Sequence, residues 1–492
     1  MYFSKTYFSK AYYREVLMFI GREYELKILE ETYQKPGFQM TVIYGRRRIG
    51  KSTLIQKFLQ GKRASYYSAS QSSLESNIKS WSEQLILDLM PAMEGMSFTD
   101  SDAFFKFAGQ LGTGERTVLA LDEIPYIAEA DPSFLSKFQN AIDQIFSQTN
   151  IYLILSGSAV SFMEKKILSE KSPLFGRRSN QIFLKPFDYL DSGKFVPGYS
   201  PEEKAIVYGL TGGVAKYLTL FDDSKSLDEN IVDNYFQTSG YLYEEPFNLL
   251  IQEFRNITSY NTVIEVCSQG ANKVNEIADK SHISTASLTY ILKNLITVGV
   301  ISKVAPMTDN GNKKKIRYEI TDSMYLFWYK FLPSARASIE MHRGDLYYEK
   351  NVKPRLHEYM GYIFEGMCQD YTLHLGLEGK LPTFISEVGS WWGTGHDRIP
   401  TDIDVVGIDT LGKHAVLGEC KFKNDPLDKD VYDRLKDRIG LIDRKYREEA
   451  LLFFSLSGFS QWMKDEAAKS DGRIRLVTLE EMYDPACIPN LN

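Results

Sequence analysis

A glycine-rich segment that carries one lysine directly follows an apolar run near the start of the chain. Residues 40–44 read MTVIY and residues 45–53 read GRRRIGKST, which has the Walker A spacing G-x-x-x-x-G-K-S. Such glycines let backbone N–H groups turn toward phosphate oxygens, while Lys51 adds positive charge and the Ser52 hydroxyl can ligate Mg²⁺. The residues expected to contact ATP are Gly45, Arg46, Arg47, Arg48, Ile49, Gly50, Lys51, Ser52 and Thr53.

A second acidic motif follows another apolar run. Residues 117–123 read TVLALDE, a stretch of the kind that is buried in a parallel sheet, and it ends in two acids. This is typical of a Walker B motif, in which Asp122 would hold magnesium through water and Glu123 would orient or deprotonate the attacking water. The alternative is that the two carboxylates only open the next helix, and the Walker A motif favours the nucleotide interpretation.

Two more polar residues are expected near the nucleotide. Ser156 follows the apolar run 151–155, and the carboxyl edge of an open α/β sheet is where ligands bind, so we expect it to sense the γ-phosphate or the water. Arg177 lies in the loop 173–178. Its guanidinium either reaches the phosphate of a neighbouring subunit, which requires a homo-oligomer, or forms a surface ion pair.

The middle of the chain reads as a helix-turn-helix followed by a hairpin. Three short segments show helical apolar periodicity, and the third, 284–297, begins with a serine that can cap it. Strands 300–304 and 316–320 would pair across a turn that holds three lysines at 313–315. This predicts a winged helix that places 284–297 in a DNA major groove and the lysines on phosphates. The alternative is that it packs against the ATPase core or a protein partner.

Four residues near the carboxyl end have the types that a metal-dependent phosphodiesterase needs. Glu365 lies on an apolar-periodic helix, Asp404 interrupts one apolar strand, and Glu419 and Lys421 end the next. The three carboxylates would hold Mg²⁺ or Mn²⁺, and the lysine would position the nucleophile or stabilise the transition state. Asp402 is a substitute ligand on the face of Asp404. Trp391, Trp392 and His396 are expected in the intervening loop, where they either line the cleft, pack in the core or occur by chance.

Several motifs together resemble one known family. They are FIGREYELKIL (19–29), GRRRIGKST (45–53), LALDEIPY (119–126), LSGSAVSFM (155–163), PLFGRRS (173–179) and YGLTGGVAKYL (208–218). These motifs resemble the archaeal-type ATPases of the STAND and AAA+ branch of P-loop NTPases. The resemblance covers essentially the whole chain after Met18, which is itself a possible start.

That resemblance carries three further expectations. It implies that Gly21, Arg22 and Glu23 pack on the nucleotide base. It also implies a helical lid that contains Gly212 and Gly213, where this chain lacks the family's usual proline. The C-terminal carboxylates are similar to those of the PD-(D/E)xK restriction-endonuclease-like fold, a domain which that family typically carries.

The elements that must position these residues amount to several domains, because 492 residues exceed what one hydrophobic core usually organises. We expect a multidomain α/β protein with an AAA+-like parallel sheet. The expected segments are an N-terminal extension (1–17), a P-loop ATPase core (18–190), a helical lid (191–258), a winged-helix domain (259–330), a linker (331–349) and a C-terminal α/β nuclease-like domain (350–492).

The composition of the chain indicates its cellular compartment but does not indicate whether it binds DNA. The chain has 58 basic and 64 acidic residues, so any DNA-binding surface must be local. Its four cysteines are far apart and form no CxxC pair, which argues against a zinc site or a disulfide framework and favours a reducing cytoplasm. No apolar stretch is long enough to span a bilayer, so we expect no membrane association.

Three functions remain open from the sequence. The first is an ATPase that acts on DNA and carries a nuclease domain. The second is an ATP-driven regulatory switch whose nuclease-like domain binds without cleaving. The third is a nucleotide-dependent assembly protein with no nucleic-acid role.

Overall fold

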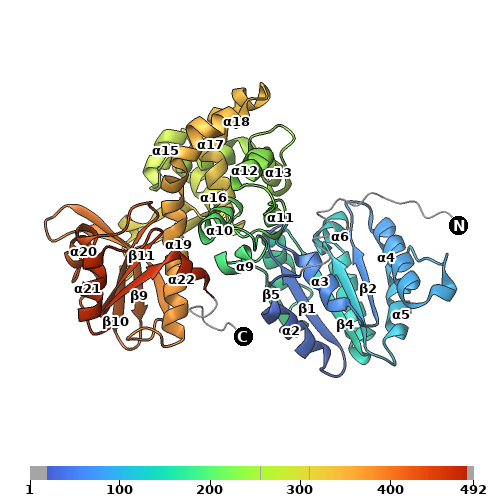
Figure 1. The fold of residues 1–492 in the computed structure, drawn as a ribbon. Helices are drawn as coiled ribbons and strands as arrows, with labels where there is room; N and C mark the ends of the chain where they lie inside the picture. The colour runs from blue at the N-terminus through green and yellow to red at the C-terminus, as the bar shows by residue number, and fades with distance from the viewer. Residues whose placement is uncertain (1–18, 255, 310, 485–492) are drawn as a thin grey trace. The chain divides into compact units, whose positions relative to one another are not determined.

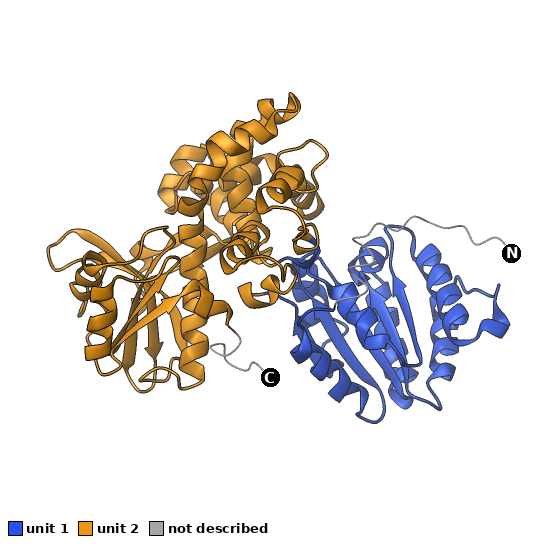
Figure 2. Ribbon diagram, in the orientation of Figure 1, with its two compact units in different colours: residues 1–187, 214–216, 492 blue, residues 188–213, 217–491 orange. Residues whose placement is uncertain are grey.

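The computed structural model describes residues 19–254, 256–309 and 311–484. They form two compact units (Figure 2). Unit 1 is the chain up to Phe187 together with Val214–Lys216, and unit 2 is Asp188–Gly213 with the chain from Tyr217 onward. The predicted extension lies outside the described residues. Of the helices that are described, none is both long enough and apolar enough to cross a membrane.

Unit 1 is built on a five-stranded parallel sheet, as the sequence predicted (Figure 1). Its strand order is β2-β3-β4-β1-β5. The strands are β1 (Gln39–Tyr44), β2 (Ala64–Ser68), β3 (Thr117–Asp122), β4 (Ile151–Gly157) and β5 (Asn180–Phe183). Every residue of β3 and β4 is buried, which explains why both read as continuous apolar runs.

Helices connect these strands and supply the core. They are α2 (Glu23–Tyr33), α3 (Lys51–Leu59), α4 (Leu74–Leu89), α5 (Ser101–Leu111), α6 (Ile124–Ala130), α7 (Phe134–Gln144) and the short α8 (Val160–Phe162). One face of the sheet packs with Trp81 of α4, Phe105 of α5 and Phe138 of α7. Phe58 of α3 meets Tyr152 of β4 with ring centroids 5.8 Å apart. Because side chains alternate along a strand, the buried side chains of β3 and β4 are divided between helices on the two faces of the sheet.

Unit 2 begins with helices and a small hairpin. Its helices before the hairpin are α9 (Tyr189–Gly193), α10 (Pro201–Thr211), α12 (Leu227–Tyr235), α13 (Glu245–Glu253), α14 (Ile257–Ser268), α15 (Val274–Ser281) and α16 (Thr285–Thr297), and α11 (Ala215–Leu218) begins in unit 1. Strands β6 (Ile301–Val304) and β7 (Arg317–Ile320) pair antiparallel, as predicted. Ser284 caps α16 by accepting a hydrogen bond from the backbone N–H of Ser287, also as predicted.

A second five-stranded sheet closes unit 2. Its order is β12-β11-β10-β9-β8, antiparallel from β8 to β10 and parallel from β10 to β12. The strands are β8 (Glu387–Thr394), β9 (Pro400–Asp409), β10 (His414–Lys421), β11 (Arg447–Ser455) and β12 (Ile474–Thr478). The helices beside it are α19 (Leu356–Leu377), α20 (Lys429–Lys436), α21 (Gln461–Lys469) and α22 (Leu479–Tyr483).

Two segments differ from the sequence expectations. Most of the predicted linker is helical, because α17 (Ser323–Glu340) continues through Pro333 and is followed by α18 (Gly344–Tyr347). A proline removes one backbone hydrogen bond, and the buried aromatic face of α17 compensates for that loss. Trp391 and Trp392 lie in strand β8 rather than in a loop, and both are buried.

Candidate nucleotide site and C-terminal carboxylate cluster

The loop between β1 and α3 has the backbone that a phosphate cradle needs. Gly45 and Gly50 have φ of 153° and 94°, and Arg48 has φ of 70°. A Cβ on Gly45 would lie 2.3 Å from the carbonyl oxygen of Leu184, so only glycine fits there. Helix α3 begins at Lys51, so the N–H groups of its first turn, which cannot be paired within the helix, lie at this loop.

Lys51 is folded back over the loop. Its Nζ donates to the carbonyl oxygens of Gly45 at 3.0 Å and Arg46 at 2.9 Å. The side chain is only 5% exposed. The lysine is therefore held beside the loop that it is expected to serve, and its role with phosphate stays a prediction.

The two Walker motifs meet at Asp122. The Ser52 hydroxyl donates to Asp122 Oδ2 at 2.6 Å, which joins residues 70 positions apart. Tyr66 donates to the same oxygen at 2.6 Å, and Ser156 donates to Oδ1 at 2.5 Å. The backbone N–H of Glu123 completes the set on Oδ1 at 3.0 Å. A carboxylate that accepts four hydrogen bonds is held in one orientation.

Glu123 stands beside this carboxylate in a strained backbone conformation. Its φ is 53°, in the left-handed region that non-glycine residues seldom adopt. It occupies the N-cap position of α6, but its side chain makes no capping hydrogen bond there. Instead, its Oε2 accepts from the backbone N–H of Ser158 at 3.2 Å. These contacts favour a chemical role over the alternative of a simple helix-opening pair.

Ser156 contacts Asp122, and its predicted role as a sensor of the γ-phosphate or the water stays a prediction. Its side chain is fully buried and its hydroxyl is donated to that carboxylate. Tyr66, which sequence reasoning did not single out, reaches the same group from β2. The register between β2 and β3, where Ser68 is opposite Asp122, places this edge residue within reach, and no local motif would have shown it.

The Gly21-Arg22-Glu23 segment contacts the phosphate loop from the side. Arg22 donates to the carbonyl oxygens of Lys185 at 2.7 Å and Ile49 at 3.3 Å, and its guanidinium lies 4.0 Å over the Phe187 ring. Glu23 is exposed at the start of α2. In this structure Arg22 supports the loop backbone, and contact with the nucleotide base stays a prediction for all three residues.

Arg177 is tied to its own unit. Its guanidinium makes a two-pronged pair with Asp143, with both N–O distances at 2.7 Å, and also donates to the carbonyls of Pro173 and Phe175. This hydrogen-bonded pair lowers the pKa of Asp143. A role as a finger in a neighbouring subunit would require this pair to open, and it stays a prediction together with the homo-oligomer.

The C-terminal carboxylates and lysine come together as the sequence predicted. The β9–β10 register pairs Gly418 with Val405 and so brings Asp404 next to Glu419. Lys421 Nζ lies 2.7 Å from Glu419 Oε1 and 3.4 Å from Asp404 Oδ2. The backbone N–H of Cys420 also donates to Asp404 Oδ2 at 2.9 Å.

Burial and mutual repulsion raise the pKa values of two acids in this cluster. Burial, and then the charge of Asp404, raise the pKa of Glu365 to about 8. Burial, and then the charge of Glu419, raise the pKa of Asp404 to about 6. Burial by itself would lower the pKa of Lys421, but the two neighbouring carboxylates outweigh it and the pKa is raised. Perturbed groups of this kind are common at functional sites.

Arg438, which the sequence did not single out, pairs with one of the predicted metal ligands. It lies just after α20, and its Nη1 lies 2.5 Å from Glu419 Oε2, so both oxygens of that carboxylate face a cation. Within the described ranges, no three or more His, Cys, Asp or Glu side chains are arranged to hold a metal ion. Both oxygens of Glu419 are paired with cations in this structure, and the metal roles of Glu365, Asp404 and Glu419 stay predictions.

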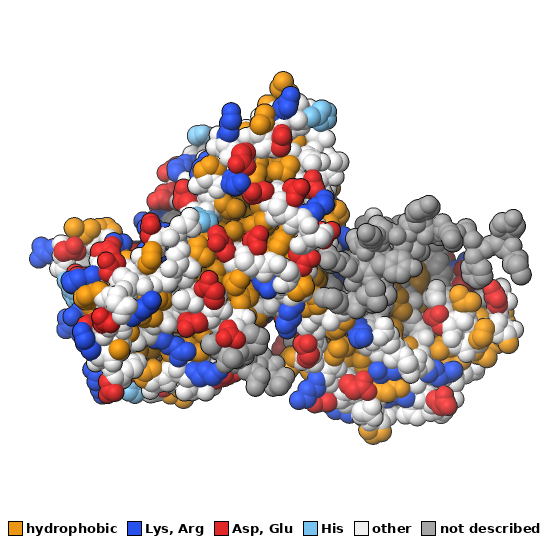
Figure 3. All heavy atoms as spheres, in the orientation of Figure 1, with side chains coloured by type: hydrophobic (Ala, Val, Ile, Leu, Met, Phe, Trp, Pro, Cys, Tyr) orange, Lys and Arg blue, Asp and Glu red, His pale blue; other side chains and the backbone are white. Residues whose placement is uncertain are grey.

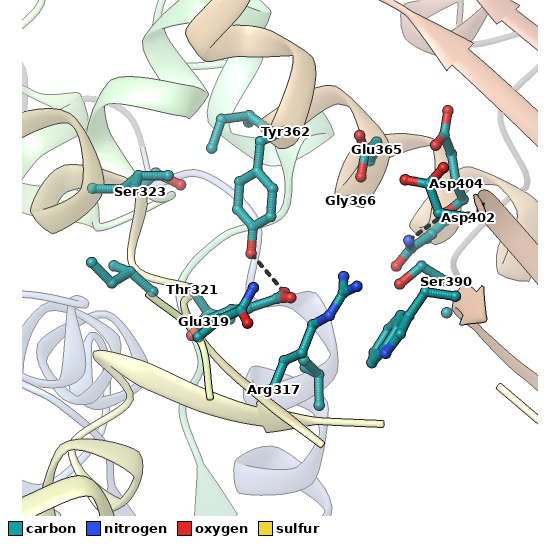
Figure 4. Close-up of a pocket in the computed structure, with 18 of the residues that line it drawn as sticks. Arg317, Glu319, Thr321, Ser323, Tyr362, Glu365, Gly366, Ser390, Asp402 and Asp404 are labelled. Carbon is teal, nitrogen blue, oxygen red and sulfur yellow. Dashed lines mark hydrogen bonds between the residues drawn. The ribbon is translucent and has the colours of Figure 1, made fainter. Parts of the chain in front are cut away.

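A cavity of about 910 Å³ lies within unit 2 beside these acids (Figure 4). Its walls come from the β6–β7 hairpin, α17, α19, β8 and β9. Glu365, Asp402 and Asp404 line one side, and Arg317 and Glu319 line the hairpin side. Glu365 and Asp404 therefore face a chamber whose other wall belongs to the hairpin.

The sequence of this chain is similar to that of known archaeal proteins. The uncharacterized protein MJECL04 of Methanocaldococcus jannaschii is 31% identical over 424 residues, which cover 85% of this chain and 91% of that protein. Residues 19–221 match an ATPase domain found predominantly in Archaea. The chain belongs to this archaeal ATPase family. Residues 328–435 of the ATPase also match a domain of archaeal and bacterial proteins of unknown function.

Other likenesses are shorter or more distant. The uncharacterized ATP-binding protein MJ0423 of M. jannaschii is 42% identical over 48 residues, which are 10% of this ATPase and 81% of that protein. Among solved structures, the Walker-type ATPase paby2304 of Pyrococcus abyssi shares 21% identity, covers 63% of this chain and 96% of its own, and has a TM-score of 0.46. The ORC2 protein of Aeropyrum pernix shares 14% identity over 67% and 98% of the two chains, with a TM-score of 0.45.

The hairpin of this ATPase is attached to the C-terminal sheet. Trp392 Nε1 donates to the carbonyl oxygen of Lys315 at 3.0 Å, and the backbone N–H of Met307 donates to the carbonyl oxygen of Ser390 at 2.9 Å. Lys315 pairs with Asp309 at 2.8 Å. The remaining two lysines of the turn, Lys313 and Lys314, are exposed. Lys315 is 31% exposed and paired, so it is less available than Lys313 and Lys314, and contact of all three with phosphate stays a prediction.

Proposed function

We propose that the protein binds ATP and hydrolyses it at the site in unit 1. The observation that carries this is the 2.6 Å hydrogen bond between Ser52 and Asp122, because it unites the phosphate loop with the acidic strand end in the manner that Mg-ATP requires. Membership in an archaeal ATPase family supports the same reaction.

Each residue has a definite part in this mechanism. The N-terminus of α3 and Lys51 bind the phosphates, and Ser52 and Asp122 offer the oxygen ligands that Mg²⁺ prefers. Bound Mg²⁺ supplies positive charge that offsets the charge on the phosphate oxygens. Glu123 accepts a proton from water, or orients that water, while the N–H of Ser158 keeps its carboxylate at the strand end.

Two variants test this proposal. We expect Lys51→Ala to lose nucleotide affinity in a titration with a fluorescent ATP analogue. We expect Glu123→Gln to bind the analogue like the parent but to release phosphate at least about a hundredfold more slowly, the range of general base catalysis. Parental turnover by Glu123→Gln would remove that residue from the mechanism.

We further propose that DNA is the partner of this ATPase, through the winged-helix arrangement of α14–α16 and the β6–β7 hairpin. The support is the outer face of α16, where Thr285, Thr289, Tyr290 and Lys293 are exposed while the opposite face is buried. Such a face can enter a major groove. The test is binding to a short duplex across a salt series, since phosphate contacts weaken steeply with salt. Affinity that is absent at low salt would contradict it.

The second candidate is that the C-terminal domain binds DNA, or regulates the ATPase, without cleaving. It is favoured by the double pairing of Glu419 with Lys421 and Arg438, because two cations on one carboxylate oppose metal binding there. Incubation with plasmid DNA and Mg²⁺ or Mn²⁺ decides whether the C-terminal domain cleaves DNA or only binds it. Nicking that Asp404→Ala and Lys421→Ala both abolish would establish a nuclease, and intact plasmid alongside DNA binding would support the binding module.

A further inference from the structure

Tyr66 is a polar side chain at the nucleotide site that no motif includes. Its hydroxyl donates to Asp122 Oδ2 at 2.6 Å, the same oxygen and the same distance as the hydroxyl of Ser52. It belongs to β2, the edge strand next to β3, and Ala120 is its partner in the ladder. Because side chains alternate along a strand, Tyr66 and Asp122 share one face of the sheet.

We propose that Tyr66 is a positioning residue that holds Asp122 in the orientation needed for Mg²⁺. This inference rests on the proposed ATPase function. Charge-assisted hydrogen bonds to a carboxylate are short and directional, and 2.6 Å is in their range. With Ser156 on Oδ1 and Tyr66 on Oδ2, the carboxylate is gripped from both neighbouring strands. Ser52 can then donate its proton to Asp122 and still direct its oxygen lone pairs toward a cation.

The geometry separates this role from simple packing. The neighbouring Tyr67 points to the other face, where its ring stacks on Trp81 and its hydroxyl donates to Asn77 Oδ1 at 2.8 Å. The hydroxyl of Tyr66 instead donates to Asp122, the carboxylate at the proposed nucleotide site.

The test compares Tyr66→Phe with the matched control Tyr67→Phe. The first substitution keeps the ring and removes only the donor to Asp122. We expect the Mg²⁺ concentration for half-maximal ATP hydrolysis to rise about tenfold, the loss that corresponds to one charge-assisted hydrogen bond of about 1.4 kcal/mol. Affinity for a fluorescent ATP analogue should weaken in Mg²⁺ but stay parental in EDTA. Tyr67→Phe should leave the Mg²⁺ dependence unchanged.

The outcomes distinguish the inference from the function on which it rests. If the parent hydrolyses ATP but Tyr66→Phe has the parental or a lower Mg²⁺ requirement in both assays, Tyr66 does not position Asp122. If the parent neither binds nor hydrolyses ATP, the proposed function fails and takes this inference with it. Thermal unfolding of both variants checks that each remains folded, and a weaker response to Mg²⁺ in the two variants alike would also overturn the assignment.

Discussion

Replacing Glu365 with glutamine should stabilise the protein at alkaline pH. Glu365 lies on α19, faces the cavity of unit 2, and has a pKa raised by burial and by Asp404 to about 8 from an ordinary 4.5. The folded state therefore holds a proton that the unfolded state has released. The contribution of Glu365 to the free energy of unfolding is fully present below about pH 4.5 and is lost as the pH rises through about 8. This is the reverse of the usual case, in which folding lowers the pKa of a carboxyl group.

The size of this change in the free energy of unfolding follows from the difference between the pKa values of Glu365 in the folded and unfolded states. At 1.36 kcal/mol for each unit of pKa, the interval from 4.5 to about 8 sets a ceiling of about 5 kcal/mol. Because the side chain lines a cavity that water can enter, solvent relieves part of the cost. We expect Glu365→Gln to raise the free energy of unfolding by about 2 kcal/mol at pH 8.5 and to leave it nearly unchanged at pH 4.5.

Thermal unfolding at the two pH values measures the effect. A gain of about 2 kcal/mol corresponds to a rise of about 4 °C in the transition that reports unit 2. The matched control is Glu358→Gln on the same helix, where the carboxylate is 70% exposed and should change little at either pH. An equal shift at pH 4.5 and pH 8.5, or a lower melting temperature at pH 8.5, would refute the burial argument.

Three further outcomes follow from single contacts. Gly45→Ala should abolish binding of an ATP analogue, because the new Cβ would meet the Leu184 carbonyl at 2.3 Å, whereas Gly114→Ala, with open space around it, should bind normally. Arg177→Lys should lower stability by about 0.5 kcal/mol in urea unfolding, since an exposed pair loses its two-pronged geometry, and a loss of ATP turnover instead would favour the finger. Trp392→Phe should speed amide exchange in the β6–β7 turn by removing the donor to the Lys315 carbonyl, and unchanged exchange would show that this bond does not hold the hairpin.

The nucleotide site was largely predictable from local sequence. A strand, a glycine turn and a helix N-terminus are contiguous, so residues 45–53 already contain most of the geometry that we propose binds phosphate. The apolar run ending at Asp122 marked a buried parallel strand. Its meeting with Ser52 could be expected because the carboxyl ends of parallel strands lie at one sheet edge.

Residues that act across the sheet or between distant elements were not predictable. Tyr66 reaches Asp122 only because β2 lies next to β3, and Arg438 reaches Glu419 only because the end of α20 folds beside β10. Neither side chain stands at a fixed spacing from its partner. The attachment of the hairpin to β8 through Trp392 likewise depends on strand pairing that no local pattern encodes.

The amino-acid order alone therefore determined the parallel ATPase sheet, the phosphate loop and the identity of the acids at both sites, since these follow from periodicity and short-range backbone chemistry. Tertiary structure alone decided which partners those acids receive. A carboxylate's chemistry depends on the donors and charges within a few ångströms of it, and those arrive from strands and helices that are distant in sequence. For Glu419 they are Lys421 and Arg438, and for Asp122 they are the hydroxyls of three different elements.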